Sequence, residues 1–334
     1  MYDLIKKLAE TWGPSGYEHH IRAAIREEVE NLADEITVDG MGNLICRMGD
    51  RGTRIMVAAH MDEIGVMAMY AEPTSRYLRF ENIGGLLQTT LLGSRVRFED
   101  GTIGTIGVHD QWGASRTKAP ALSQFYIDVS NGEGIEVHEG QPAVFDGPVF
   151  ARGSRVVGRA LDDRVGCAVA IEAMRRLSQT PLKNEVYFVF TVQEEVAVRG
   201  AYAAGYGVNP DVAIAVDVTG TGDQPHDLKM SVKLGAGTAI KVLDKGMIVP
   251  PAVRDWMVDT ADANNIPYQM ELLPMGQTDA AAIQRTRAGV PGGVVSIPCR
   301  YIHTISETVD IADVEASVDL LAALVAAPVA LQQT

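Results

Sequence analysis

Three short apolar runs constrain the fold of this chain more than any other feature, because each ends directly in polar side chains. The runs cover residues 54–59, 185–192 and 212–216. Nearly continuous apolar runs of this length are typical of strands buried on both faces of a parallel sheet. Around them the apolar residues recur at helical spacing, over residues 2–11, 17–32, 165–177 and 311–327. The sequence therefore predicts an α/β fold, in which helices cover a central sheet.

Polar side chains that can bind metal ions mark the ends of these strands. His60 follows the first run, Glu194 and Glu195 follow the second, and Asp217 closes the third. A fourth expected strand, near the end of the chain, is followed by His303. Because ligands of open α/β sheets bind at the carboxyl edge of the strands, these side chains can meet there. Taken singly, each also fits an ordinary role, such as a hydrogen-bonded core histidine or a solvated loop residue.

Two adjacent carboxylates, Asp162 and Asp163, precede the helix expected at 165–177. Such a pair can cap a helix N-terminus. Away from water it needs a cation, a protonated partner or full solvation. We interpret Asp162 as a bridge between two metal ions, because this explanation links the pair to the strand ends. Two imidazoles and three carboxylates suit two zinc, cobalt or manganese ions that share one carboxylate.

Two neighbouring metal ions favour hydrolysis, since they polarise a carbonyl group and lower the pKa of a bridging water from 15.7 towards about 7. Neighbouring side chains of extended backbone point to opposite faces, so Glu194 and Glu195 are not expected to serve one metal together. One of them is left to act as general base. Asp62 is placed to orient His60 through the second ring nitrogen, although a solvated aspartate also fits.

Residues 70–153 differ in character from the rest of the chain. Short β-rich pieces alternate with glycine and proline, and helical periodicity nearly vanishes; the pieces are 77–81, 94–98, 104–108 and 125–129. We therefore predict a small β-barrel or sandwich inserted between two elements of the α/β domain. The predicted division is a catalytic domain of residues 1–69 and 154–334, and an inserted β-barrel domain of residues 70–153.

Composition excludes several classes of function. A net charge of −14 and a pI near 4.9 oppose binding to nucleic acid. No stretch approaches the roughly 20 apolar residues of a membrane span, and no apolar segment of a signal peptide follows the N-terminus. The three cysteines are Cys46, Cys167 and Cys299, which lie far apart. This spacing favours a reducing compartment, so we expect a cytoplasmic protein without a thiolate zinc site.

Seven segments carry a resemblance to a known family. They are residues 59–65, 158–166, 191–195, 216–219, 267–269, 278–280 and 300–303. In this order they resemble the glutamyl aminopeptidases and tetrahedral (TET) aminopeptidases, a family of metallopeptidases whose members have also been named endoglucanases. The resemblance extends over essentially the whole chain.

The resemblance implies a mixed-sheet α/β/α metallopeptidase domain with an inserted β-barrel that helps to build homo-oligomers, often a dodecamer. It implies two divalent ions per subunit. The implied ligands are His60 and Asp217 for one ion, Glu195 and His303 for the other, and Asp162 as the bridge. Glu194 would be the general base and Asp62 the partner of His60. The Asp162–Asp163 peptide bond would be cis.

We therefore expect an aminopeptidase that removes N-terminal residues from peptides. A related amide hydrolase, such as a deacylase or dipeptidase, could use the same metals. Glycoside hydrolysis has no use for two histidines. A catalytically silent assembly protein would not need the complete ligand set. Specificity for acidic residues would require a cation in the pocket, and Arg199, Lys245 or Arg300 could supply one.

Overall fold

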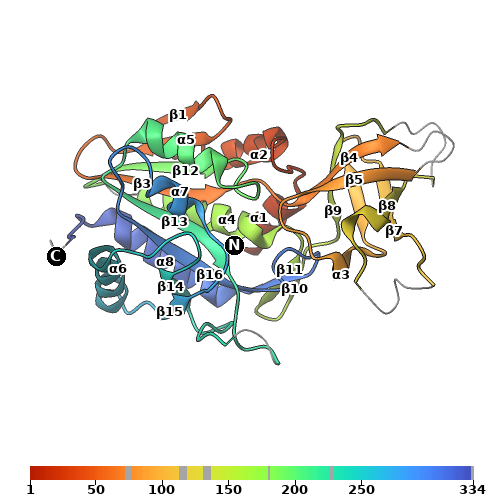
Figure 1. Cartoon of the computed structure of the whole chain (residues 1–334). Coiled ribbons are helices and arrows are strands. Elements are labelled where there is room, and N and C mark those ends of the chain that lie inside the picture. The colour runs from red at the N-terminus through yellow and green to blue at the C-terminus, as the bar shows by residue number, and fades with distance from the viewer. Residues whose placement is uncertain (72–76, 113–118, 131–136, 180, 226–228, 332–334) are drawn as a thin grey trace.

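A computed structural model describes residues 1–71, 77–112, 119–130, 137–179, 181–225 and 229–331. Within these residues, the chain forms an α/β body built on one large sheet, with a separate closed β-barrel beside it (Figure 1). The prediction of a mixed-sheet α/β fold with an inserted barrel is therefore confirmed.

Eleven of the described strands form the central sheet, in the order β1-β2-β12-β3-β13-β16-β17-β11-β10, with β14 and β15 attached beside β16. The middle strands β12, β3, β13 and β16 run parallel, so their carboxyl ends share one edge. Antiparallel pairs on either side make the sheet mixed. The strands are β1 (Glu35–Val38), β2 (Leu44–Met48), β3 (Arg54–His60), β10 (Phe150–Arg152), β11 (Arg155–Gly158), β12 (Glu185–Thr191), β13 (Val212–Thr219), β14 (Thr238–Leu243), β15 (Tyr268–Leu272), β16 (Gly292–Arg300) and β17 (Glu307–Asp310).

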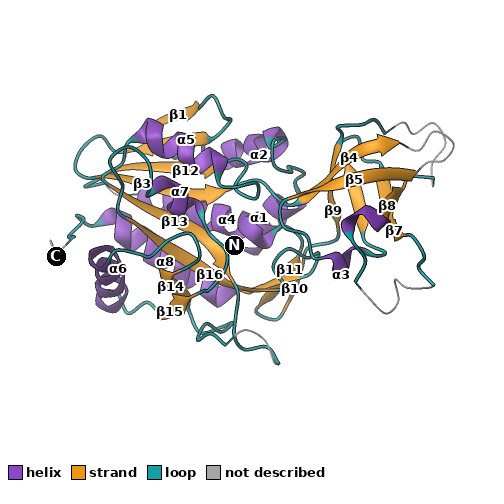
Figure 2. Cartoon of the chain, viewed as in Figure 1, coloured by secondary structure: helices purple, strands orange, loops and turns teal. Residues whose placement is uncertain are grey.

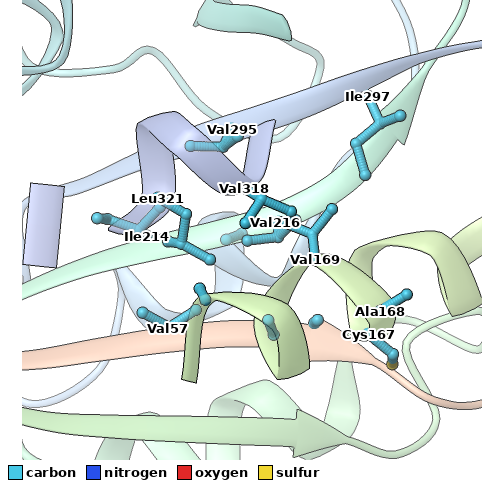
Figure 3. Packing of buried hydrophobic residues seen from close by; sticks show 14 of the residues in the cluster. Val57, Cys167, Ala168, Val169, Ile214, Val216, Val295, Ile297, Val318 and Leu321 are labelled. Carbon is cyan, nitrogen blue, oxygen red and sulfur yellow. The ribbon is translucent and has the colours of Figure 1, made fainter. Parts of the chain in front are cut away.

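Helices cover both faces of the sheet (Figure 2). On one face, α4 and α8 pack together, and their apolar side chains meet those of β3, β13 and β16 (Figure 3). On the other face, α5 and α7 pack together against β3, β12 and β13. The helices of this body are α1 (Tyr2–Glu10), α2 (His19–Val29), α4 (Leu161–Leu177), α5 (Arg199–Val208), α6 (Pro251–Ala263), α7 (Asp279–Ile283) and α8 (Ile311–Ala326).

The barrel closes in the order β4-β5-β8-β7-β6-β9 and has its own apolar core. Its elements are β4 (Gly65–Ala71), β5 (Tyr77–Ile83), α3 (Gln88–Leu91), β6 (Arg95–Phe98), β7 (Ile103–Val108), the short helix η2 (Leu122–Gln124), β8 (Phe125–Asp128) and β9 (Pro142–Asp146). The barrel strands thus lie between Gly65 and Asp146, while β10 returns to the central sheet. Domain limits at residues 70 and 153 stay a prediction.

Two features differ from the sequence-based expectation. Asp217 lies inside β13 and not at its end, because the pairing of β13 with β16 continues to Thr219 and Pro298. Residues 238–283 contain β14, α6, β15 and α7, for which we had predicted no elements. None of the helices in the described part of the chain is long and apolar enough to cross a membrane.

Candidate metal and catalytic site

The carboxyl edge of the central sheet borders a cleft of about 680 Å³. It is lined by six of the seven side chains predicted to act in the site: His60, Asp162, Glu194, Glu195, Asp217 and His303. They come from β3, the start of α4, the β12–α5 connection, β13 and the β16–β17 connection. The seventh, Asp62, is fully buried beside His60. The structure therefore brings together all seven side chains that we predicted to act in the site.

Asp162 lies between the two histidines. Its Oδ1 is 3.0 Å from Nε2 of His60, and its Oδ2 is 3.4 Å from Nε2 of His303. The same nitrogen of His303 is 3.2 Å from Oε2 of Glu195, and Nε2 of His60 is 3.8 Å from Oδ1 of Asp217. Each oxygen of Asp162 thus faces a different imidazole, and each imidazole faces a second carboxylate.

The backbone around Asp162 departs from a regular helix. α4 begins at Leu161, but Asp162 and Asp163 have non-helical dihedral angles, and the peptide bond between them is cis, as the resemblance implied. The backbone N–H of Asp162 donates to Oε2 of Glu307 (3.0 Å), and that of His303 donates to Oε1 (2.8 Å). Glu307 therefore holds two site segments together, a role that its ordinary place in a strand did not suggest.

Asp62 binds the backbone of the neighbouring site segment. Its carboxylate accepts hydrogen bonds from the N–H groups of Glu194 (3.0 Å) and Glu195 (3.2 Å), and from the hydroxyl of Ser15 (2.6 Å). Nδ1 of His60 is 3.5 Å from Oδ1 of Asp62 and 3.2 Å from its carbonyl oxygen. Ser15 lies in the turn between α1 and α2, and the turn directs its hydroxyl at this carboxylate.

The barrel contributes to the wall of the site. Gly84 and Gly85 follow β5, and a Cβ atom at Gly85 would lie 3.0 Å from Nδ1 of His303. At Gly84, where φ is +77°, a Cβ atom would lie 3.1 Å from Oε2 of Glu195. Only glycine allows this close approach without moving the two side chains. Sequence reasoning missed this contact, because the glycines follow a strand of the barrel and not one of the central strands whose ends carry the predicted ligands.

Negative charge is concentrated in the site. Burial raises the pKa of Glu194 and of Asp217 well above the ordinary carboxyl range. Burial acts to raise the pKa of Asp162 as well, but hydrogen bonds from His303 and His60 outweigh it and hold that pKa below its ordinary value. The carboxylates therefore repel one another in surroundings that solvate them poorly.

Several buried oxygens of this cluster lack a protein donor. Among the described residues, Oε1 of Glu195, Oδ2 of Asp163 and Oδ1 of Asp279 have no hydrogen-bond partner. Leaving such oxygens uncompensated is costly. Two sets of ligand atoms lie close enough to hold an ion, one from His60, Asp162 and Glu195, the other from His60, Asp163 and Asp217. This combination of imidazole and carboxylate donors fits divalent cations.

Two cations at or near the cleft, Lys241 and Arg300, have acidic partners. Nζ of Lys241, which lines the cleft, is 2.7 Å from Glu271 and 3.1 Å from Asp244. Arg300 binds Asp223 through two nitrogens, at 2.7 and 3.1 Å. Of the side chains that line the cleft, many others are apolar or small, among them Val218, Met230, Leu273, Met275 and Ile302. Arg199 and Lys245 are not among the lining residues.

Comparison with known proteins agrees with this geometry. Residues 42–320 match the family model described as M42 glutamyl aminopeptidase. A relative from Acetivibrio thermocellus that carries an aminopeptidase name is 45% identical over 325 residues, covering 96% of this chain and 97% of the relative.

Solved structures give the same result. Aminopeptidase APDkam598 from the archaeon Desulfurococcus kamchatkensis has a TM-score of 0.91 and 38% identity, covering 97% of this chain and 94% of that one. The TET1 peptidase of Pyrococcus horikoshii, which can assemble into a tetrahedron or a large octahedral shell, has a TM-score of 0.85 and 33% identity, covering 97% and 98%. The family model, the relative and the shared fold together show that this chain is a peptidase and belongs to the M42 family of aminopeptidases.

Proposed function

We propose that this chain is a dinuclear metal-dependent aminopeptidase that removes N-terminal residues from peptides. The observation that supports this most directly is the position of Asp162, whose two oxygens face His60 and His303 separately. In this proposal His60 and Asp217 hold one ion, Glu195 and His303 hold the other, and Asp162 is shared. The donor set suits zinc or cobalt, and manganese is also compatible.

Two divalent ions would polarise the scissile carbonyl and supply a hydroxide nucleophile at neutral pH. Glu194 would take the proton from the attacking water and deliver it to the leaving amine. Burial raises the pKa of Glu194, and a raised pKa is the direction that makes a carboxylate a better proton acceptor. Asp62 would keep His60 in place and, through the N–H groups of Glu194 and Glu195, would fix the position of the base.

The surplus of carboxylates also suits the free amine of the substrate. A protonated N-terminus is attracted to a carboxylate of the cleft that holds no ion, such as Glu194, whereas an acetylated terminus carries no charge to attract. This difference separates an aminopeptidase from the alternatives, a deacylase or a dipeptidase, since a deacylase cleaves substrates whose amine is blocked.

A panel of aminoacyl-p-nitroanilides with free and N-acetylated termini, together with dipeptides and longer peptides, tests the proposal. The protein is stripped of metal, and hydrolysis is measured before and after zinc, cobalt or manganese is added. We expect metal-dependent cleavage of free termini only, on dipeptide and longer peptide substrates alike. Release of acetate from the acetylated substrates would favour the deacylase, and cleavage restricted to dipeptides would favour the dipeptidase. No cleavage with two ions bound would leave a silent assembly protein.

We further propose that the barrel assembles the enzyme into a homo-oligomer, with a tetrahedral dodecamer as the leading arrangement. The barrel exposes large apolar side chains, namely Met69, Tyr70, Tyr77 and Trp112, and Trp112 is 79% exposed. Exposed apolar groups of this size are typical of protein interfaces. Light scattering coupled to gel filtration tests the proposal, because a monomeric mass at micromolar concentration would contradict it.

The cysteines are free and buried, which supports a cytoplasmic location.

A further inference from the structure

A second cluster of possible metal ligands lies outside the cleft, where the α/β body meets the barrel. His19 and His20 begin α2, and Glu99 follows β6 of the barrel. Nε2 of His19 is 2.8 Å from Oε1 of Glu99, and Nε2 of His20 is 3.0 Å from the same oxygen. All three side chains are about half exposed. Two imidazoles from one segment thus converge on one carboxylate from another.

The spacing of these atoms is close to that of ligands around a zinc ion. Zinc bonds to nitrogen and oxygen are about 2.0 Å long, so tetrahedral ligand atoms lie about 3.3 Å apart. The three ligand atoms of the cluster all lie within 4.8 Å of one another. Moving each imidazole nitrogen a few tenths of an ångström away from the carboxylate would make room for an ion, and water could complete the coordination from the exposed side.

The aromatic surroundings hold the two rings in place. The indole of Trp12 packs edge-on against His20 and His19, with ring centroids 5.7 and 6.0 Å apart. The indole N–H donates to the carbonyl oxygen of Arg97, two residues before Glu99 in the barrel (3.2 Å). Trp12 therefore fixes the histidines relative to the segment that carries the carboxylate, which reduces the ordering that metal binding requires.

We propose that His19, His20 and Glu99 form a further divalent-metal site, separate from the catalytic cleft, that takes zinc or a similar borderline ion. The ion would tie the start of α2 to the barrel. The positive end of the α2 dipole opposes a cation at this place, and the carboxylate of Glu99 offsets it. With three protein ligands and high exposure, the site would bind its ion more weakly than a buried structural site does.

The variant Glu99→Gln isolates the metal role from a purely structural one. Glutamine retains an oxygen that can accept hydrogen bonds from both imidazoles, so a simple hydrogen-bonded contact would survive. The neutral amide is a poor ligand for zinc, so a metal site would not survive. His20→Ala removes one nitrogen ligand as a second variant. His138→Ala, at an exposed histidine elsewhere on the barrel, is the matched control.

The measurement is the amount of zinc bound per subunit, in full-length protein that is first stripped with a chelator and then dialysed against a series of buffered zinc concentrations. We expect the wild type and His138→Ala to bind one more zinc per subunit than Glu99→Gln and His20→Ala. The comparison does not depend on how many ions the cleft holds or on catalysis. Equal zinc contents in all four proteins across the series would overturn the proposal and leave the cluster as a hydrogen-bonded contact.

Discussion

The buried ion cluster beneath the site gives the sharpest prediction about stability. Glu63 forms ion pairs with Arg159 and with Arg164, whose Nη2 is 3.2 Å from Oε1. These three side chains are between 0% and 3% exposed. Burial is the largest cause that lowers the pKa of Arg159 to about 9 and that of Arg164 to about 10, and the charge of Arg164 lowers the pKa of Arg159 further. We therefore expect Glu63→Gln to leave two buried guanidinium groups without their counter-ion.

The cost follows from the burial. Removing one partner of a buried ion pair typically destabilises a protein by about 3–5 kcal/mol. For 334 residues, an unfolding entropy of about 2.1 cal/mol/K per residue amounts to roughly 0.7 kcal/mol/K. The expected fall in Tm of Glu63→Gln is therefore about 4–7 °C.

Thermal unfolding followed by circular dichroism, at one scan rate and one protein concentration, measures this shift. The matched control is Glu27→Gln, because Glu27 also pairs with a cation, Lys7 at 3.2 Å, but is 72% exposed. An exposed pair contributes about 0.2–1 kcal/mol, which corresponds to at most about 1.5 °C. If Glu63→Gln melted no lower than Glu27→Gln, the claim that Glu63 neutralises buried charge would be refuted.

Four further predictions concern the cleft and its rim. Glu194→Gln should lower kcat by a factor of about 10²–10⁴ while the metal content, measured by mass spectrometry, stays at the wild-type level. Asp62→Asn should weaken metal binding about 10–100-fold in a competition with a chelating dye. The substitution disturbs the contact of residue 62 with the His60 imidazole and its hydrogen bonds from two backbone N–H groups. Leucyl-p-nitroanilide should be hydrolysed with a higher kcat/KM than glutamyl-p-nitroanilide, because Lys241 and Arg300 already have acidic partners and much of the cleft wall is apolar. The opposite order would show that a free cation reaches the substrate. Although burial opposes it, the hydrogen bonds from Arg300 lower the folded-state pKa of Asp223 to about 2. This ion pair therefore stabilises the protein above pH 4 and ceases to do so as the pH falls towards 2. In urea unfolding, the free energy of unfolding of the wild type should exceed that of Asp223→Asn by less at pH 3 than at pH 5.

The strands and the main side chains of the site could be predicted because both depend on local patterns. A buried parallel strand is an apolar run, and a polar residue at its carboxyl end must lie at the ligand-binding edge. This reasoning found His60, Glu194, Glu195 and His303. It misplaced Asp217 relative to the end of β13, because the length of a strand depends on the neighbour with which it pairs.

The supporting contacts could not be predicted, because they depend on which segments meet in space. Ser15 lies in a turn between two helices, and Glu307 is the first residue of β17, a strand paired on both sides, so neither has a local pattern that distinguishes it. Their partners are 47 and 145 residues away in the chain. Gly85 touches His303 only because the barrel folds back against the sheet. Tertiary contacts of this kind leave no periodic signal.

The site and the buried ion cluster share the same short segments, which explains why a costly cluster is retained. In residues 60–63 and 159–164, side chains that line the site lie within a few positions of those that form the cluster. Arg164 donates to the carbonyl oxygens of Leu8, Thr11 and Gly13, just before the turn in which Ser15 reaches Asp62. The buried arginine is thus connected to the backbone that carries the proposed base through the chain between Gly13 and Ser15 and the hydrogen bonds of Asp62. An apolar replacement of the cluster would avoid the cost of burying charge, but it would lose these contacts. For that reason, changes in the cluster should alter the position of the proposed catalytic groups as well as the stability of the fold.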